Sequence, residues 1–306
     1  MAVWEYDTVI FVAANGGLAN RLRALVGYDA LCRLRGCRLY VYWRPDVACE
    51  AAFTDLFEPS GLTVVTDDEA STLLQSKRTR LYHTQKWFSA VWRDDIPDVP
   101  RAAFFKEVRA SLDRLTPTQA IADAAAAFRR ERALDGALGV HIRHTDNVEV
   151  YTSGSHESQV LDRHKMSTVD GFIGAIGAHI DRMPVFLATD NARIERQCHE
   201  IFGDRLVTYP KHYACEWEPP AYVDRCPPLR TTAVSEALVE MLLLRSCRRI
   251  VGTYFSSFSK FAALWGRVEY LEMIGGRPQS SAMVDRIFEE FRACEPAAHL
   301  ARDASR

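Results

Sequence analysis

The sequence predicts an α/β protein built from two doubly wound parallel sheets. Short apolar runs rich in β-branched residues alternate with longer stretches of helical spacing, and this alternation occurs in two series along the chain. Each strand-like run is followed by glycine or polar residues, which is typical of strands in open parallel sheets. With 306 residues, the chain is long enough for two such domains.

The first series begins with residues 8–13 (TVIFVA), which we expect to form a buried strand. Gly16 and Gly17 follow it, and leucines then recur at helical spacing up to Gly36, where the helix should end. Residues 38–43 (RLYVYW) predict the next strand, so this order is a βαβ unit. Further along we expect a short helix, a strand and a less regular stretch, at 51–57, 62–65 and 67–100.

Thr116-Pro117 marks the start of a helix that should end near Gly136, and the second series follows it. Its expected strands are 137–142, 185–189, 205–209, 249–252 and 268–273, and its expected helices are 169–182, 192–202, 231–246 and 256–265. Between them lie a polar loop at 147–167 and an irregular segment at 211–230. We place an N-terminal Rossmann-like domain at 1–125, a second one at 126–275, and a C-terminal helix and tail at 276–306.

Composition narrows the class of protein. Hydrophobic residues make up 48% of the chain and charged residues 25%, which is typical of globular proteins. The 38 basic and 40 acidic residues nearly cancel, so no global field favours nucleic acid or an anionic membrane. We find neither a signal-peptide pattern nor an apolar run long enough for a membrane span, and we expect a cytoplasmic protein without nucleic-acid partners.

The eight cysteines form no CxxC pair, so we expect reduced thiols, most of them in the core. A metal site made by His212, Cys215 and Cys226 is a weak alternative. The sequence also lacks the phosphate-binding loop of P-loop NTPases, the nucleophile elbow of α/β-hydrolases and the HExxH zinc motif. These three classes of enzyme are therefore excluded.

Three segments carry candidate chemistry, and the first is 15–23 (NGGLANRLR). Arg21 and Arg23 lie near the start of a predicted helix, where the positive end of the helix dipole disfavours cations. An anion shared between the arginines and the helix terminus would explain them. A tight turn with solvated arginines explains them equally well.

The second segment is 141–147 (HIRHTDN), at the carboxyl end of a predicted strand, where open α/β folds bind ligands. Arg143 is able to chelate a phosphate with two hydrogen bonds, and Asp146 could orient it. The structural alternative is a core histidine at His141 and an ion pair between Arg143 and Asp146. Because several titratable residues crowd one strand end, we favour a functional role.

The third segment is 252–261 (GTYFSSFSKF), again where a strand gives way to a helix. Its serines are able to cap the helix and to bind phosphate oxygens, and Lys260 in the first turn would suit a nearby anion. Phe255 and Phe258 could flank a flat base. Taken alone, this segment is better explained as an ordinary serine cap with core phenylalanines.

Together these segments resemble the fucosyltransferase superfamily with a GT-B-like fold. The similarity is closest to the nodulation and core α1,6-fucosyltransferases and more distant to the peptide O-fucosyltransferases. It is carried, in family order, by NGGLANRLRAL, LYVYWRPD and FTDLF, then by LGVHIRHTD, VFLATDN, ALVEMLLL and RIVGTYFSSFSKFA. The resemblance implies two Rossmann-like domains that face a cleft, with the acceptor on the N-terminal side and a GDP-sugar on the C-terminal domain.

The resemblance also implies roles for single residues. Arg143 would clasp the β-phosphate of the donor, Glu240 would read guanine, and His144 stands where core fucosyltransferases have a second arginine. The other residues implied in donor binding are Gly16, Gly17, Asn20, Arg21, His141, Asp190, Ser256, Ser257 and Phe258. Arg143, Asp146 and Glu149 are the expected catalytic residues. Glu149 is the first candidate for the general base, although it is out of register with the family's glutamate, and Glu157 and His156 are alternatives.

The function that the resemblance implies is inverting transfer of a hexose, with fucose from GDP-fucose preferred, to a hydroxyl of a glycan or a glycosylated small molecule. We expect neither a divalent metal nor a cofactor, because arginine would neutralise the diphosphate. Two alternatives stay open. One is transfer from another GDP-hexose such as GDP-mannose, and the other is a nucleotide-sugar-binding partner protein that has lost transfer.

Overall fold

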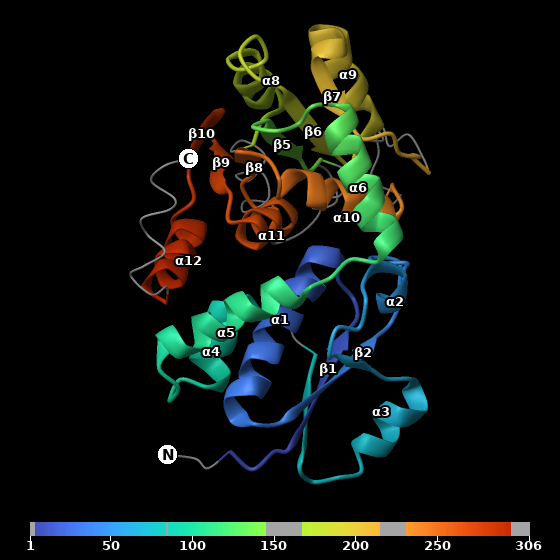
Figure 1. Cartoon of the computed structure of the whole chain (residues 1–306), viewed down its shortest axis with the longest axis vertical. Helices are drawn as coiled ribbons and strands as arrows, with labels where there is room; N and C mark the ends of the chain where they lie inside the picture. Colours follow the sequence, from blue (N-terminus) through green and yellow to red (C-terminus); the bar gives the residue numbers. More distant parts are fainter. Residues whose placement is uncertain (1–3, 84, 145–166, 215–230, 295–306) are drawn as a thin grey trace, which may run out of the picture. The chain divides into compact units, whose positions relative to one another are not determined.

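The computed structural model describes residues 4–83, 85–144, 167–214 and 231–294. The chain forms two compact units, one of Met1–Thr118 with Asp285–Arg306 and one of Gln119–Val284 (Figure 1). The units divide at residue 118, whereas the sequence placed the boundary at 125, within what is helix α6 (Gln119–Glu131). The division also assigns the C-terminal segment from Asp285 to the first unit.

The first unit is built on a fully parallel four-stranded sheet in the order β3-β2-β1-β4. Its strands are β1 (Thr8–Ala13), β2 (Arg38–Trp43), β3 (Thr63–Val64) and β4 (Thr79–Tyr82). Its helices are α1 (Leu18–Arg35), α2 (Phe53–Leu56), α3 (Asp67–Leu73), α4 (Phe88–Asp95) and α5 (Arg101–Arg114). Helix α1 packs against both α4 and α5, and it ends at Gly36, whose φ of 66° is in the left-handed region that glycine favours.

The second unit is built on a six-stranded sheet in the order β10-β9-β8-β5-β6-β7, parallel except for the β9–β10 pair. Its strands are β5 (Leu138–Ile142), β6 (Val185–Thr189), β7 (Leu206–Thr208), β8 (Arg249–Thr253), β9 (Glu269–Ile274) and β10 (Arg277–Ser280). Its helices are α6, α8 (Val169–Gly177), α9 (Ala192–Phe202), α10 (Val234–Leu244) and α11 (Ser257–Gly266), with a short 3₁₀ turn at Gly203–Arg205. Helix α12 (Ala282–Ala293) spans the division between the units.

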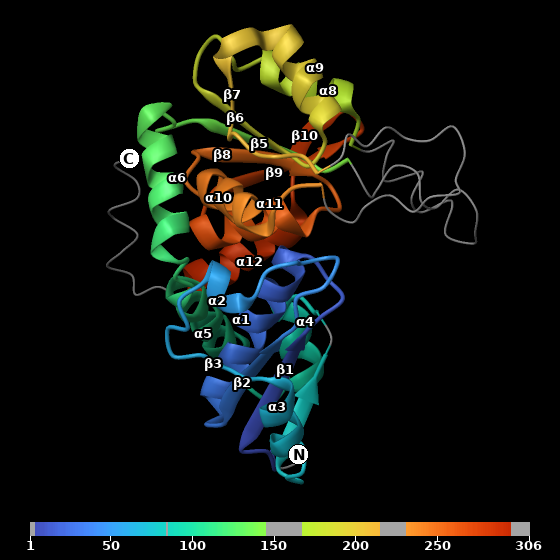
Figure 2. The ribbon, with the colours of Figure 1, turned by 90° about the vertical axis from the view of Figure 1, so that its right-hand side faces the viewer.

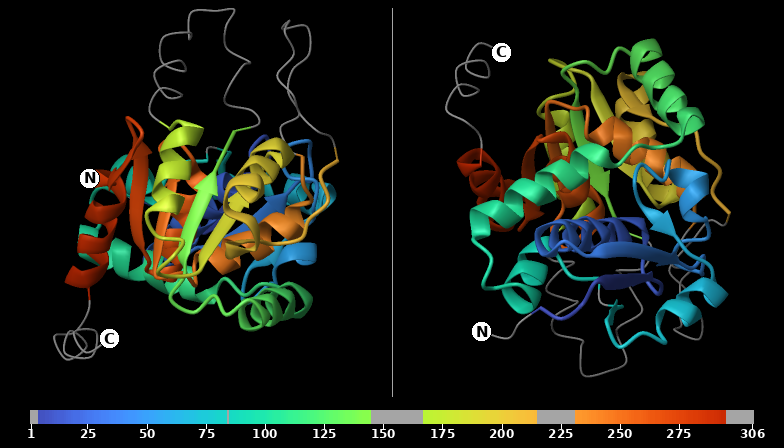
Figure 3. Two further views of the ribbon diagram at one scale, coloured as in Figure 1. Left: turned by 90° about the horizontal axis from the view of Figure 1, so that it is seen from above. Right: turned by 60° about the horizontal axis from the view of Figure 1, so that its bottom comes forward.

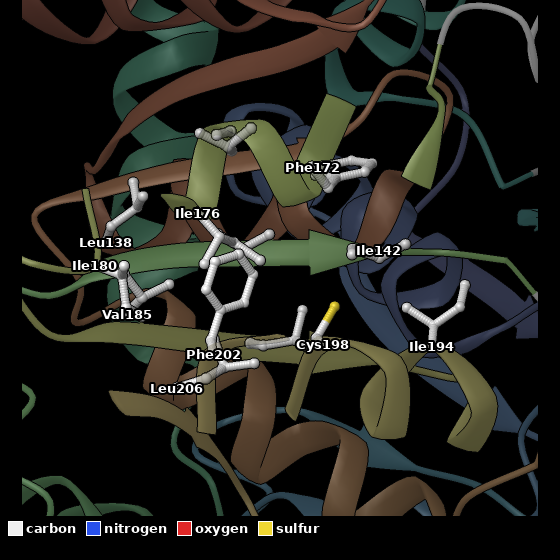
Figure 4. Packing of buried hydrophobic residues seen from close by; sticks show 14 of the residues in the cluster. Leu138, Ile142, Phe172, Ile176, Ile180, Val185, Ile194, Cys198, Phe202 and Leu206 are labelled. Carbon is white, nitrogen blue, oxygen red and sulfur yellow. The ribbon is translucent and has the colours of Figure 1, made fainter. Parts of the chain in front are cut away.

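Helices cover both faces of the second sheet. Helices α8 and α9 lie side by side over one face, and α10 and α11 lie over the other (Figures 2 and 3). Because both faces are covered, every residue of β5 and β6 is buried, which explains why these strands are continuous apolar runs. The core under α8 and α9 is made of Leu138, Ile142, Phe172, Ile176, Val185, Cys198, Phe202 and their neighbours (Figure 4).

The strand order contains one reversal that positions the functional site. The chain proceeds from β5 to β6 and β7 on one side, and then returns to place β8 on the other side of β5. The carboxyl ends of β5 and β8 therefore flank a topological switch point, which is where open α/β sheets bind ligands. The second and third candidate segments, at 141–147 and 252–261, both begin at this point.

The sequence analysis was wrong about two stretches. The segment 67–100 is not irregular, because it contains α3, β4 and α4, and helix α5 follows it without having been expected. The C-terminal segment holds strand β10 in addition to the expected helix. Within the described residues, no helix is both long enough and apolar enough to cross a membrane.

Candidate functional site

The carboxyl ends of β5 and β8 are joined by the side chain of Thr253. The backbone N–H of Arg143 donates to Thr253 Oγ1 at 2.9 Å, and the Thr253 hydroxyl donates to the carbonyl of His141 at 3.2 Å. On the other side of β5, the Thr189 hydroxyl donates to the carbonyl of Ile142 at 2.8 Å. The backbone that carries Arg143 is therefore fixed from both neighbouring strands.

The Arg143 guanidinium is oriented by Asp190, which directly follows β6. Arg143 Nε lies 3.1 Å from Asp190 Oδ2, and the backbone N–H of His144 donates to Asp190 Oδ1 at 2.9 Å. The Arg143 side chain is 25% exposed, so the guanidinium stays accessible while its carboxylate partner holds it. Burial lowers the pKa of His144. This arrangement presents a fixed cation at the strand end, as binding of a phosphate requires.

His141 is buried at the end of β5 and its ring stacks on Phe258, with a centroid separation of 5.0 Å and an interplanar angle of 25°. Its Nδ1 atom has no hydrogen-bond partner within the described residues. Burial, together with the positive charges of Arg143 and Lys211, lowers the pKa of His141 to about 3. The imidazole is therefore neutral at physiological pH, and its Nδ1 is an unused polar atom beside an aromatic ring.

Glu240 is a buried carboxylate on α10. Its Oε1 atom lies 2.6 Å from Lys211 Nζ, and the same ammonium lies 2.8 Å from Glu195 Oε2. Burial raises the pKa of Glu240 to about 7, although the Lys211 ammonium acts to lower it. The resemblance identified Glu240 but gave no sign of its partners, because Lys211 and Glu195 are distant in sequence.

One pocket joins these groups. It is lined by His141, Arg143, Thr189, Asp190, Thr231, Thr232, Ala237, Glu240 and Phe258. A cation, a buried carboxylate, a neutral imidazole and an aromatic ring thus lie around a single space. This set of groups is able to bind a ligand with an anionic part, a flat ring and N–H donors.

Ser256 and Ser257 lie at the turn between β8 and α11, which follows the carboxyl end of β8. Ser256 is the N-terminal cap of α11, and its hydroxyl oxygen accepts from the N–H of Phe258 at 3.3 Å. The N-terminus of this ten-residue helix provides backbone N–H groups and a positive dipole end. Lys260 does not serve an anion here, because its Nζ lies 2.7 Å from Glu272 Oε1 and also donates to the carbonyl of Tyr254.

The glycine turn of the first unit has a different construction from the one we expected. Arg21 is 0% exposed, and its guanidinium donates to the carbonyls of Gly16 and Ala13 at 2.7 and 2.9 Å. It also lies 2.7 Å from Asp46 Oδ2. The charge of Arg21 is therefore neutralised inside the protein, and its guanidinium ties the turn to β1. Arg21 neither shares a bound anion with the helix terminus nor is solvated, which were the two expectations from the sequence.

The other residues of this turn also serve packing. A Cβ at Gly16 would lie 1.8 Å from the side-chain oxygen of Gln85, so a larger residue there would displace the end of that side chain, and Gly17 caps α1 with its backbone. Asn20 lies in the first turn of α1. Arg23 lies over the ring of Trp87 at 4.6 Å and donates to the Gln85 carbonyl. These residues belong to the first unit and line no part of the pocket described above.

Asp146 and Glu149, as well as the alternative bases His156 and Glu157, lie outside the described residues. The alternative metal site at His212, Cys215 and Cys226 falls partly outside them as well. Among the residues that the structure describes, no group of three or more histidine, cysteine, aspartate or glutamate side chains could hold a metal ion. None of the cysteines in the described ranges forms a disulfide, and Cys32, Cys49, Cys198 and Cys247 are buried.

Comparison with solved structures identifies the fold. The α1,6-fucosyltransferase NodZ from Bradyrhizobium aligns over 89% of this chain and 96% of its own, with 17% identity and a TM-score of 0.55. The structure of NodZ α1,6-fucosyltransferase from a crystal soaked with GDP-fucose aligns over 87% of this chain and 94% of its own, with 17% identity and a TM-score of 0.55. A fucosyltransferase of Arabidopsis thaliana in complex with GDP aligns over 88% of this chain and 70% of its own, with 14% identity and a TM-score of 0.53.

The fold is that of the GT-B fucosyltransferases. This confirms the expected fold class, a GT-B-like architecture of two Rossmann-like units. At 14–17% identity the likeness establishes the architecture alone. No family model matches the sequence, and no curated protein matches it.

Proposed function

We propose that the protein is an inverting glycosyltransferase that uses a GDP-sugar donor, with fucose as the preferred hexose. The observation that carries this proposal is the pocket at the switch point of the second unit, where Arg143, His141 and Glu240 meet. The fold supports it, since structures with this architecture include a NodZ crystal soaked with GDP-fucose. The acceptor would be a hydroxyl of a glycan or of a glycosylated small molecule.

The proposed base-reading group is Glu240. Guanine presents two adjacent N–H donors, N1–H and the exocyclic amine, and one carboxylate is able to accept both. Adenine and uracil lack this pair, so they would leave a buried carboxylate without its partners, which costs binding free energy. The stacked pair of His141 and Phe258 lines the same pocket and provides an aromatic surface and an unused nitrogen next to the base.

The proposed diphosphate site is made by Arg143 and the N-terminus of α11 at Ser256 and Ser257. As the bond between the anomeric carbon and the phosphate oxygen breaks, negative charge develops on the leaving GDP. A fixed guanidinium and oriented N–H groups stabilise that charge, and each such contact contributes about 3–4 kcal/mol to catalysis. Asp190 would keep Arg143 oriented without further rearrangement. Asp146 stays a proposed partner in this segment.

The proposed reaction is a single displacement through an oxocarbenium-like transition state. A general base removes the proton of the acceptor hydroxyl, its oxygen bonds to the anomeric carbon from the opposite face, and GDP leaves. Glu149 is the first candidate for this base, with Glu157 and His156 as alternatives. The cationic groups around the diphosphate support a reaction without a divalent metal or a cofactor.

Incubation with nucleotide sugars tests the proposal. The protein is mixed with GDP-fucose, GDP-mannose or UDP-glucose and a panel of glycan acceptors, and released nucleotide is measured with and without acceptor. Acceptor-dependent release of GDP from GDP-fucose supports the proposal, and release from GDP-mannose alone would favour the other hexose. Tight GDP-fucose binding without turnover for any acceptor would favour a nucleotide-sugar-binding partner protein. Absence of GDP binding would contradict all of these.

A further inference from the structure

We propose that Lys211 is a positioning residue that holds Glu240 as an ionised acceptor in the base pocket and thereby sets the selectivity for guanine. The inference rests on the proposed function, in which Glu240 reads the base. Lys211 matches none of the motifs that support the resemblance, and it lies in a segment without regular secondary structure. Its importance comes from its contacts alone.

Lys211 is held between two carboxylates from different helices. Its side chain is 0% exposed, and its Nζ atom lies 2.6 Å from Glu240 Oε1 on α10 and 2.8 Å from Glu195 Oε2 on α9. Helices α9 and α10 cover opposite faces of the sheet (Figure 2). Along the chain, Lys211 follows β7, which is an edge strand of this sheet. The ammonium thus links the two helical layers at the carboxyl side of the strands.

Lys211 acts through Glu240 and not on the ligand directly. Glu240 lines the pocket, whereas Lys211 is absent from the residues that line it. An ammonium behind the carboxylate fixes the orientation of the carboxylate and leaves its pocket-facing lone pairs to accept N–H groups. One carboxylate oxygen has two lone pairs, so the contact with Lys211 does not prevent it from accepting from guanine.

The charges around Glu240 make its ionisation depend on the Lys211 ammonium. Glu195 and Asp190 both add negative charge near Glu240, and burial also opposes its ionisation. Within the described part of the chain, Lys211 is the cation that bonds to Glu240 directly, while Arg143 lines the same pocket paired with Asp190.

Among the residues that the structure describes, the remaining titratable groups near Glu240 do not replace that ammonium. His141 is neutral, Tyr213 donates to Glu195 Oε2 at 2.7 Å, and burial raises the pKa of Tyr209, which lies near Glu236 and Glu240. With Lys211 present, the pKa of Glu240 is about 7. Loss of the ammonium would raise it further and leave Glu240 protonated at neutral pH.

A protonated Glu240 would read the base poorly. One oxygen of the carboxyl group then carries a hydrogen. That O–H would face an N–H donor of guanine, so one of the two hydrogen bonds to the base would be lost. The loss of a charge-assisted hydrogen bond costs about 1.5–3 kcal/mol, or roughly a tenfold to hundredfold loss of affinity. Uracil offers no such donor pair, so UDP binding should change little.

The experiment compares GDP and UDP affinity by calorimetric titration of the full chain between about pH 6 and pH 9. Both nucleotides carry the same titrating diphosphate, so the ratio of the two affinities isolates the base. For the wild type we expect the GDP preference to fall below about pH 7 as Glu240 is protonated. Lys211→Met should reduce the preference about tenfold or more at pH 7.5 and recover it toward pH 9. Lys211→Arg should retain most of it.

Lys260→Met is a matched control, because Lys260 is also a largely buried lysine, 11% exposed at its side chain, on a buried glutamate in the same unit, with Nζ 2.7 Å from Glu272 Oε1. We expect it to lower the thermal midpoint without changing the ratio of GDP to UDP affinity. Loss of the hydrogen bond from Lys260 to the Tyr254 carbonyl would disturb the turn before α11, where the diphosphate is proposed to bind. It would therefore change the affinities for GDP and UDP alike and leave their ratio unchanged. In a Glu240→Gln background, Lys211→Met should have no further effect on the ratio, since no charge is left to hold.

Glu195→Gln keeps the inference testable if Lys211→Met does not fold. Removal of this second negative charge should extend the GDP preference to lower pH, the opposite direction from the loss of Lys211. A Lys211→Met protein with wild-type selectivity and pH profile, or with tighter GDP binding, would overturn the inference while leaving the proposed donor intact. A wild type that binds GDP and UDP equally would instead overturn the proposed function, and this inference with it.

Discussion

The single residue on which the proposed chemistry depends most is Arg143, whose guanidinium is aligned by Asp190 at the carboxyl end of β5. We expect Arg143→Ala to reduce acceptor-dependent GDP release at least about 100-fold, because a fixed donor to the leaving diphosphate is lost. Arg143→Lys should fail similarly, since a point charge does not replace a two-pronged donor. Steady-state rates with GDP-fucose measure both.

Arg205→Ala is the matched control for Arg143. Arg205 is also paired with an aspartate, Asp181, but both side chains are more than half exposed. The control should keep wild-type rates, and all three variants should keep their thermal midpoints within a few degrees. Near wild-type turnover by Arg143→Ala would show that the phosphate assignment is incorrect.

Glu240→Gln tests the base assignment without altering the size of the side chain. We expect GDP affinity to fall about tenfold or more, while affinities for ADP and UDP change little, because only guanine uses both carboxylate oxygens. The substitution should also remove the fall in GDP preference below about pH 7, since that fall follows protonation of Glu240. Equal affinity of the wild type for the three nucleotides would remove the ground for a GDP-sugar donor.

At this scale, sequence reasoning anticipated which residues lie together where a strand or helix sets their place, and their roles stay predictions. His141, Arg143 and Glu240 were predicted together and line one pocket. It did not work where a long side chain finds a partner far along the chain. Arg21 reaches Asp46, and Lys211 reaches Glu240, so neither pairing is visible in local spacing. The dipole argument for Arg21 left out the buried carbonyls that accept from it.

At the scale of elements, strands buried on both faces were predicted accurately because their apolar runs are continuous. The expected ranges 8–13 and 185–189 coincide with β1 and β6, and the range 38–43 coincides with β2, of which only Val41 and Trp43 are buried. Exposed elements were missed, since β10 has no buried residue and β4 buries only Tyr82. Helix α3 did carry a signal, because Thr66 and Glu69 form a capping box at its start.

The close packing of β8 on α11 gives a prediction at the same scale. A Cβ at Gly252 would lie 2.3 Å from Ser259 Oγ and 2.6 Å from Tyr270 Oη, two buried hydroxyls that hydrogen-bond to each other. We expect Gly252→Ala to lower the free energy of unfolding by about 1–3 kcal/mol. Gly174→Ala in α8 is the control, because its Cβ would meet nothing within 4 Å and it should stabilise the helix slightly. Denaturant unfolding compares them, and equal stabilities would contradict this packing.

At the scale of the whole molecule, the alternation of strands and helices was enough to predict two parallel sheets, because each βαβ step brings the next strand beside an earlier one. The division of the chain was not predictable in the same way. The C-terminal segment groups with the first unit, where Phe291 packs on Phe105 and Arg101 pairs with Glu290. Contacts between positions so far apart leave no local pattern.

The charge arrangement of the second unit supports a last prediction about the whole enzyme. A diphosphate bound at the switch point would meet the Arg143 guanidinium and the positive end of α11, and these groups supply the neutralisation that a divalent cation provides in other transferases. We therefore expect turnover with GDP-fucose to change by less than about twofold after exhaustive treatment with EDTA, and added Mn²⁺ to have no effect. Thermal midpoints measured with and without EDTA check that any change is not caused by unfolding. A loss of about 100-fold on chelation that Mn²⁺ restores would contradict this prediction and assign the leaving-group role to a metal in place of Arg143.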